Sequence, residues 1–143
     1  MLHPVLFLDA LEILLSSRRE DMVLAGYTAS KTRGDCTFDG YPLQFYLRGK
    51  PVLPYSCVES KQVKELPTEI EYYKGWKVLN REATIYSMFE FENDDWSIME
   101  MISYYCDNLK ESDLTNYFRH RDNGKHFAEY LSLLEDSRTM YNY

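Results

Sequence analysis

The sequence contains few of the residues from which disulfide frameworks and zinc sites are built. It has three cysteines in 143 residues, an odd number. Cys36, Cys57 and Cys106 are widely spaced and form no Cys-x-x-Cys pair, which indicates reduced thiols. Reduced thiols are typical of a cytoplasmic protein, so we predict that location, and we predict neither a metal site nor a cofactor.

Signatures of catalysis are also missing. The sequence has no glycine-rich phosphate-binding loop and no G-x-S-x-G turn. His120 and His126 are six residues apart, and we interpret both as surface residues. Cys106 and either histidine are residue types that can form a nucleophile–base pair. No local nucleophile signature accompanies Cys106, so nothing further in the sequence supports such a pair. We therefore predict no catalytic residues, and a binding protein rather than an enzyme.

Long hydrophobic runs suited to a membrane are absent. Residues 1–17 are apolar, but the segment has no basic start, contains Asp9 and Glu12, and is too short to cross a bilayer. We expect a soluble protein with no membrane contact. Pro4 and the aliphatic spacing of residues 5–15 predict a buried N-terminal helix.

An excess of basic residues is missing as well. The formal net charge is −7 at pH 7. Residues 1–80 hold equal numbers of acidic and basic side chains, so the whole acidic excess lies in residues 81–143. A surface of this sign repels a phosphate backbone, and we predict no direct binding of nucleic acid. The acidic half suits a basic partner or serves solubility.

The clearest structural signal in the sequence is a hairpin. Apolar and polar residues alternate with period two on both sides of the dipeptide Lys74-Gly75. With these two residues as the turn, an aromatic pair closes the loop. The predicted opposed pairs are Tyr73 with Trp76, Glu71 with Val78, and Ile70 with Leu79.

Three further segments of the first half show weaker patterns. Residues 22–28 form a short apolar run, which predicts a buried strand. Residues 30–40 are polar and predict a loop, either bare or with a short strand through residues 36–38. The alternation in residues 43–47 predicts a half-buried strand, and residues 56–67 indicate a loosely organised stretch.

From residue 80 onward the hydrophobic period is helical. Asn80 can cap a first helix, Asp94 or Asp95 a second and Ser112 a third, and Asn123-Gly124 precedes the last. The predicted buried stripes are Ile85, Met88 and Phe89; Ile98, Met101, Ile102 and Tyr105; Leu114, Tyr117 and Phe118; and Phe127, Tyr130, Leu131 and Leu134.

The order of these elements predicts the fold class α+β. It comprises the N-terminal helix, a small antiparallel sheet with the hairpin at Lys74-Gly75, and a C-terminal helical half. No repeat, low-complexity tract or linker divides the chain. We therefore predict a single domain over residues 1–143, in which residues 1–80 form the helix and sheet and residues 81–143 are helical.

Aromatic residues give the main indication of function. They make up 15% of the sequence, with 13 tyrosines and seven phenylalanines, too many to fit wholly inside a core of this size. The basic cluster YFRHR can bind an acidic or phosphate-bearing partner. The predicted partner-binding residues are Tyr104, Tyr105, Tyr117, Arg119, Arg121 and Tyr130, of which we expect some to belong to the core.

Three segments together resemble a known family. They are residues 11–28, the run TRGDCTFDGYPLQFYLRG and the run EIEYYKGWKVLNREATIYSMFEF. In this order they resemble the effector domain of the AbiE-type abortive-infection antitoxins (AbiEi family), in which a hairpin with a glycine turn and a segment R-E-x-T-(aliphatic)-x-D lead into the helical half. Here residues 75–78 and 81–85 occupy those places. Tyr86 and Ser87 stand where the family usually has an aspartate, and the family's DNA-binding winged helix is missing.

The resemblance implies a toxin–antitoxin protein that acts in phage defence. Such a protein neutralises a partner, such as a nucleotidyltransferase-type toxin or another nucleic-acid-handling enzyme, by binding it. Two alternatives remain open. One is an acidic inhibitor from a phage or mobile element, whose carboxylates imitate the phosphates of nucleic acid. The other is a small enzyme of unknown type, with His120 or His126 beside Cys106 or a carboxylate in a pocket.

Overall fold

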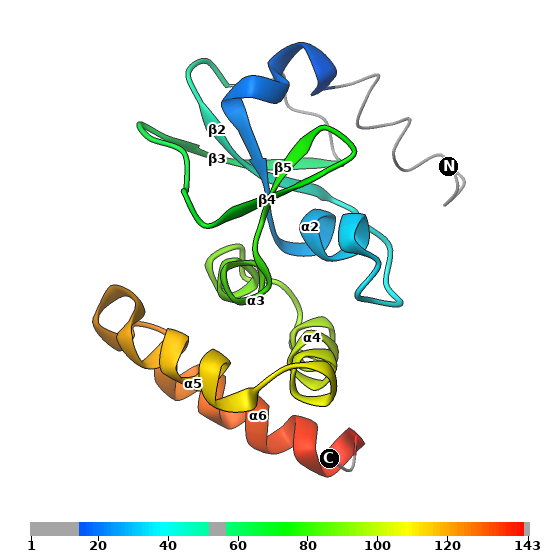
Figure 1. Cartoon of the computed structure of the whole chain (residues 1–143), viewed down its shortest axis with the longest axis vertical. Coiled ribbons are helices and arrows are strands. Elements are labelled where there is room, and N and C mark those ends of the chain that lie inside the picture. The colour runs from blue at the N-terminus through cyan, green and yellow to red at the C-terminus, as the bar shows by residue number, and fades with distance from the viewer. Residues whose placement is uncertain (1–14, 52–56, 142–143) are drawn as a thin grey trace. The chain divides into compact units, whose positions relative to one another are not determined.

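The computed structural model describes residues 15–51 and 57–141 and divides into two compact units, Met1–Asn80 and Arg81–Tyr143 (Figure 1). The predicted α+β class is confirmed, because one unit carries a five-stranded sheet and the other is helical. The boundary falls where the hydrophobic period changes from two to that of a helix. The expected helix over residues 5–15 lies, except for Leu15, outside the described residues, and the single-domain organisation stays a prediction.

The first unit is built on a mixed sheet of strand order β3-β2-β1-β5-β4. The pairs β1–β2 and β4–β5 are antiparallel, whereas β1–β5 and β2–β3 are parallel. The expectation of an antiparallel sheet is therefore wrong for two pairings, since local patterns do not show which distant strands become neighbours. The elements are η2 (Ser16–Asp21), β1 (Met22–Leu24), α2 (Gly26–Arg33), β2 (Leu43–Arg48), β3 (Val58–Val63), β4 (Ile70–Tyr73) and β5 (Trp76–Leu79).

The hairpin of β4 and β5 has the predicted register. Tyr73 opposes Trp76, and the pairs further from the turn follow as expected. Lys74 and Gly75 have φ angles of 51° and 84°, both positive, as a two-residue type I′ turn requires. Trp76 is buried, so its indole anchors this edge of the sheet in the core.

The predicted strand over residues 22–28 is wrong in its second half, because α2 begins at Gly26. The hydrophobic pattern did not indicate this helix, because its buried face carries polar side chains. The Thr28 hydroxyl, for example, donates to the Gly40 carbonyl at 2.9 Å. Residues 30–33, expected in a loop, form its last turn. Gly34 ends the helix with a φ of 77°, the left-handed conformation that glycine adopts readily.

The stretch expected to be loosely organised contains strand β3. It pairs with β2 at the edge of the sheet, and its residues are mostly exposed or half-buried. An edge strand with Glu59, Lys61 and Gln62 facing solvent carries no hydrophobic alternation, so its sequence resembles that of a loop. Charged side chains on such an edge also discourage pairing with another chain.

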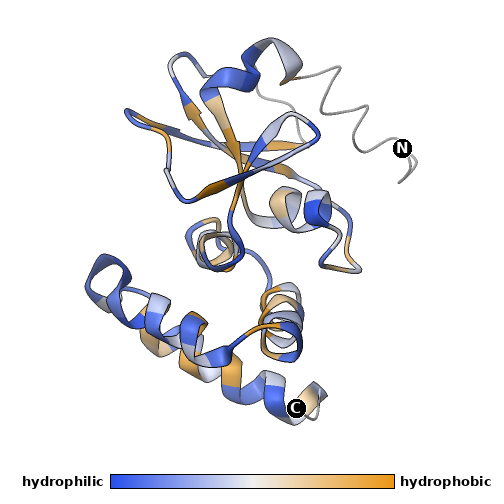
Figure 2. Ribbon diagram, viewed as in Figure 1, coloured by the Kyte–Doolittle hydropathy of each residue, from blue (hydrophilic) through white to orange (hydrophobic). Residues whose placement is uncertain are grey.

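One core cluster of the first unit lies on one face of the sheet, Val23 and Leu79 are buried on the other face, and Figure 2 shows hydrophobic residues along the middle strands. Two arginines stack on rings around it. The Arg19 guanidinium lies 4.4 Å from the centre of the Trp76 ring, and that of Arg33 lies 5.2 Å from that of Tyr73. Arg33 also pairs with Glu71 at 2.8 Å, which ties α2 to the hairpin. The core residues are Leu15, Met22, Leu24, Ala29, Leu43, Phe45, Leu47, Trp76 and Val78.

The second unit consists of helices, and their expected starts are largely confirmed. Asp94 caps the second of them, since its Oδ2 accepts from the Ser97 amide at 2.9 Å. The third begins at Glu111, just before the expected cap Ser112, with Lys110 at the N-cap. The elements are α3 (Arg81–Glu90), α4 (Asp95–Asn108), α5 (Glu111–His120), η3 (Arg121–Gly124) and α6 (Phe127–Tyr141).

The buried stripe of α6 differs from the expected one. Leu131 is 41% exposed, and Leu133 lies in the core in its place. The inward positions are Tyr130, Leu133, Leu134 and Ser137, which follow the spacing i, i+3, i+4, i+7. Residues 137–141 continue the helix, and Arg138 pairs with Glu111 at 2.6 Å. In the described part of the chain, no helix is both long and apolar enough for a membrane crossing.

The turn geometry predicts the effect of a substitution at Gly75. Gly75→Val should lower the free energy of unfolding by about 1–2 kcal/mol, because a β-branched residue is strained at a φ of 84°. Its Cβ would also lie 3.1 Å from Nη1 of Arg19. Urea denaturation followed by circular dichroism measures the change.

Lys74→Asn is the matched control in the same turn. Asparagine tolerates positive φ, so this variant should be as stable as the parent or slightly more stable. Parental stability of Gly75→Val would show that the turn does not need glycine.

Candidate functional site

An aromatic cluster at the centre of the helical unit fixes the geometry of the candidate site. The Phe118 side chain is fully buried and stacks on Tyr130 with ring centres 4.3 Å apart. It also contacts Tyr86 at 5.3 Å and Phe89 at 5.2 Å. These rings come from α3, α5 and α6, so one side chain of α5 locks three helices together. The turn η3, which follows α5 directly, is thereby held in place.

A hydrogen bond from Tyr86 anchors this turn. Its Oη donates to Oδ2 of Asp122 at 2.5 Å. Burial, with a smaller contribution from this bond, raises the pKa of Tyr86 well above its usual value, so the hydroxyl stays a donor at neutral pH. Asp122, Asn123 and Gly124 all have positive φ angles, and the bond holds Asp122 in this uncommon conformation.

A second set of polar groups ties the end of α3 to the start of α6. His126 Nε2 and Lys125 Nζ each lie 3.0 Å from the same Glu90 oxygen, Oε2. Burial alone would raise the pKa of the Glu90 carboxyl group. The hydrogen bonds from His126 and Lys125 and the electrostatic interactions with these two groups outweigh burial, so the pKa of Glu90 is lowered. Glu90 is therefore a carboxylate. The interpretation of His126 as a surface residue is wrong, since its residue exposure is 9% and its ring packs on Tyr86 and Phe89.

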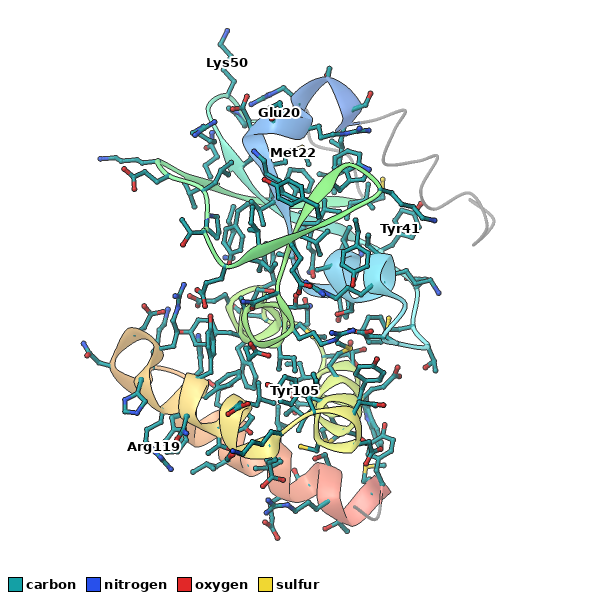
Figure 3. All side chains as sticks on the ribbon, in the orientation of Figure 1. Glu20, Met22, Tyr41, Lys50, Tyr105 and Arg119 are labelled. Carbon is teal, nitrogen blue, oxygen red and sulfur yellow. The ribbon has the colours of Figure 1, made fainter. Side chains whose placement is uncertain are left out.

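Two exposed arginines lie beside these groups on aromatic rings. The Arg121 guanidinium is 5.6 Å from the centre of the Tyr86 ring and 6.0 Å from that of Tyr117. That of Arg119 is 5.4 Å from the centre of Phe127, and its Nη1 donates to Oδ1 of Asn116 at 3.0 Å. Figure 3 shows Arg119 directed outward from α5. Cation–π contacts of this kind restrain a guanidinium while its outer edge faces solvent.

The structure brings two of the six predicted partner-binding residues, Tyr117 and Arg121, into contact. Arg119 lies two residues before Arg121 at the end of α5, over the ring of Phe127, and we call these three residues the Arg119–Arg121 surface. Tyr104 is half-buried on α4, where the Arg81 guanidinium lies 5.9 Å from its ring. It belongs to a different part of the unit.

Tyr105 and Tyr130 are core residues and are not available to a partner. Their exposures are 3% and 0%, and Figure 3 shows Tyr105 among the helices. Both hydroxyls are satisfied internally. Burial raises the pKa of Tyr105, with a hydrogen bond to Glu82 adding to the effect. Burial also raises that of Tyr130 to about 12, while its Oη lies 2.9 Å from the Thr115 hydroxyl.

Sequence reasoning missed Tyr86, Glu90, Asp122 and Lys125 as site residues, and it named His126 only in the alternative of a small enzyme. The run from Arg119 to His126 does carry a signal, because basic residues lie on both sides of the turn-forming residues 122–124 there. The sequence around Tyr86 and Glu90 carries no such signal, since these residues contact that run only through the tertiary packing of α3. The suggested combination of Cys106 with a histidine is not observed. Cys106 Sγ lies 3.7 Å from Oε1 of Glu111.

The described residues also offer no constellation for a metal. Among residues 15–51 and 57–141, no three or more His, Cys, Asp or Glu side chains are grouped so as to hold an ion. What the site can do with the groups present is bind an anion through guanidinium edges, or transfer a proton at His126.

The lowered pKa of Glu90 predicts how stability depends on pH. A carboxyl group with a lower pKa in the folded state stabilises the fold above its ordinary pKa, and this contribution is lost as the pH falls through the folded value. Glu90→Gln should therefore cost about 1 kcal/mol at pH 7, and the difference from the parent should vanish in acid.

Urea denaturation at a series of pH values between neutral and strongly acidic measures this difference. The control is Glu135→Gln, which removes a carboxylate that is 76% exposed and 3.6 Å from Arg138. Its cost should stay near zero throughout. A difference for Glu90→Gln that does not change with pH would contradict the assignment.

Comparisons with protein-family models, with curated proteins and with solved structures find no match to this chain. The resemblance to the AbiEi family therefore stays a prediction. The function is argued below from the chemistry of the site.

Proposed function

We propose that the protein is a non-enzymatic binding module that contacts a protein partner through the Arg119–Arg121 surface. The observation that carries this proposal is the placement of two exposed guanidinium groups over buried or half-buried rings. Each ring belongs to the locked cluster of α3, α5 and α6. The surface is therefore preformed in the free protein.

Preformed arginines favour binding for an entropic reason. A long side chain that is already restrained loses less conformational freedom when a partner fixes it, so more of the contact energy remains as affinity. Arginine and tyrosine are also the residues that most often dominate interfaces. A guanidinium edge matches the two oxygens of a carboxylate or phosphate. We infer that the partner presents such an anionic group to Arg119 and Arg121.

The acidic excess of residues 81–143 limits the overall charge that a protein partner can have. A strongly acidic protein would be repelled by the unit as a whole, even if it matched the two arginines. The best fit is a protein of neutral or basic overall charge with a local anionic group. Attraction at long range then comes from the acidic unit, and recognition at contact comes from the arginines.

The resemblance to the AbiEi family supports an antitoxin-like role. In this proposal the chain neutralises a nucleotidyltransferase-type toxin, or a related nucleic-acid-handling enzyme, by occupying its surface in the cytoplasm. Such an enzyme handles phosphate backbones, so its surface is basic. That agrees with the partner inferred from charge, without fixing which enzyme it is.

One observation favours the alternative of a small enzyme. His126 Nδ1 is buried and forms no hydrogen bond within the described residues, while Glu90 holds the opposite nitrogen at 3.0 Å. A carboxylate on one nitrogen can stabilise the charged ring when the other nitrogen takes a proton. His126 is then a candidate general base. Its Nδ1 also lies 3.9 Å from Oε1 of Glu129.

Capture from cells of the protein's own host tests the binding proposal. The tagged parent should recover one protein in stoichiometric amount, and Arg119→Ala combined with Arg121→Ala should weaken its affinity at least tenfold, which is about 1.4 kcal/mol. The charge-matched control combines Lys64→Ala with Lys110→Ala, two exposed lysines elsewhere. It should capture the partner as the parent does.

Thermal denaturation verifies that the arginine variant remains folded, as expected for side chains on the surface. Undiminished capture by a folded arginine variant would rule out this surface. Equal weakening by the lysine control would show that overall charge is responsible instead. A parent that captures nothing would favour the enzyme alternative, which predicts that His126→Gln abolishes turnover without unfolding the chain.

A further inference from the structure

Trp96, at the start of α4, is exposed to an extent unusual for its type. It is 62% exposed, whereas the other tryptophan, Trp76, is 1% exposed. An indole is the largest apolar side chain, and its exposure to water is unfavourable. Tryptophan is also the residue most enriched among those that dominate binding interfaces. A lone exposed indole on a rigid helix is therefore a candidate contact.

The outward direction of Trp96 follows from the register of α4. The buried residues of α4 begin at Ile98, one turn into the helix, whereas Trp96 in the first turn is exposed. The cap by Asp94 fixes where the helix starts and so fixes this register. Asp94 accepts from the Ser97 amide and, at 2.8 Å, from the Ser97 hydroxyl. The indole is thus presented by a well-defined first turn.

Carboxylates lie close to Trp96 in the sequence. Asp95 precedes it in the same turn and Glu92 lies in the connection before the helix, both exposed. Within residues 15–51 and 57–141, neither of them forms an ion pair. Glu100 is one turn further along, on the same face as Trp96. The indole therefore lies in a locally negative field.

We propose that Trp96, Glu92 and Asp95 form a docking surface, the Trp96 surface, for a basic segment of a protein partner. The ring face attracts an arginine or lysine cation, and the two carboxylates bind the adjacent cations of the segment. Charge complementarity selects this occupant, because a phosphate-bearing ligand is repelled and a purely apolar one leaves the carboxylates without partners. The surface is opposite in sign to the Arg119–Arg121 surface and does not depend on its function.

The test uses the full chain and a synthetic peptide of alternating arginine and glycine. Isothermal titration calorimetry at low salt should show saturable binding, and the fluorescence of Trp96 should change with the same midpoint while buried Trp76 contributes little. A peptide of alternating glutamate and glycine should not bind. Trp96→Ala should weaken binding of the arginine peptide at least tenfold, and so should Glu92→Gln combined with Asp95→Asn.

The control combines Glu135→Gln with Asp136→Asn, which removes the same charge from exposed positions of α6. Its affinity should stay within twofold of that of the parent. Trp96 is exposed, so its replacement should leave the melting temperature almost unchanged. Unaltered binding by Trp96→Ala would overturn the proposal. Equal weakening by the α6 control would overturn it as well, since net charge alone would then attract the peptide.

Discussion

The packing of one phenylalanine ring determines the geometry of the helical unit. Phe118 stacks on Tyr130 and contacts rings from α3, so three helices share a single buried side chain. Close-packed interiors transmit displacements, because rings cannot shift without their neighbours. The residues that immediately follow Phe118 are the arginines and the turn η3. The position of the candidate surface is therefore a consequence of the core rather than of a loop, which explains how exposed side chains can have defined positions.

Around this core, two sets of polar contacts hold the turn η3. One is a hydrogen bond donated by a neutral tyrosine, and the other is formed by an ionised glutamate. Tyr86 remains a neutral donor because burial disfavours its ionised form, and it binds the Asp122 carboxylate. Glu90 remains ionised because His126 and Lys125 both bind it. Asp122 also lies 3.8 Å from Nε of Arg121, so it satisfies the tyrosine and orients the arginine. A single aspartate thus links the buried ring to the exposed cation.

The sequence correctly predicted those features of the fold that are determined by residues close together in the chain. The hairpin register follows from two residues of turn chemistry and from alternation beside them, and the cap by Asp94 acts within four residues. Prediction was wrong where tertiary contacts override local pattern. Helix α2 buries polar threonine and serine, β3 is a polar edge strand, and two strand pairings are parallel. In the site, the arginines were found from their clustering, whereas Glu90 meets Lys125 and His126 only through the packing of α3.

The net charge of the chain does not show that basic and acidic side chains are gathered in different places within the helical unit. The formal charge of −7 alone suggests one kind of partner. Yet three of the unit's cations lie close together in sequence at the α5–α6 junction, whereas Glu92 and Asp95, exposed carboxylates without an ion pair among the described residues, precede the exposed indole at the start of α4. Fields from exposed charges decay within roughly 10 Å at moderate ionic strength, so at contact each surface is recognised by its own local sign, while the net charge of the unit acts on a partner before contact at low salt. A partner with both a basic segment and an anionic group could engage the two surfaces together, and the second contact would then form at high effective concentration. Two modest contacts on one rigid unit can in this way give the affinity of a single large interface.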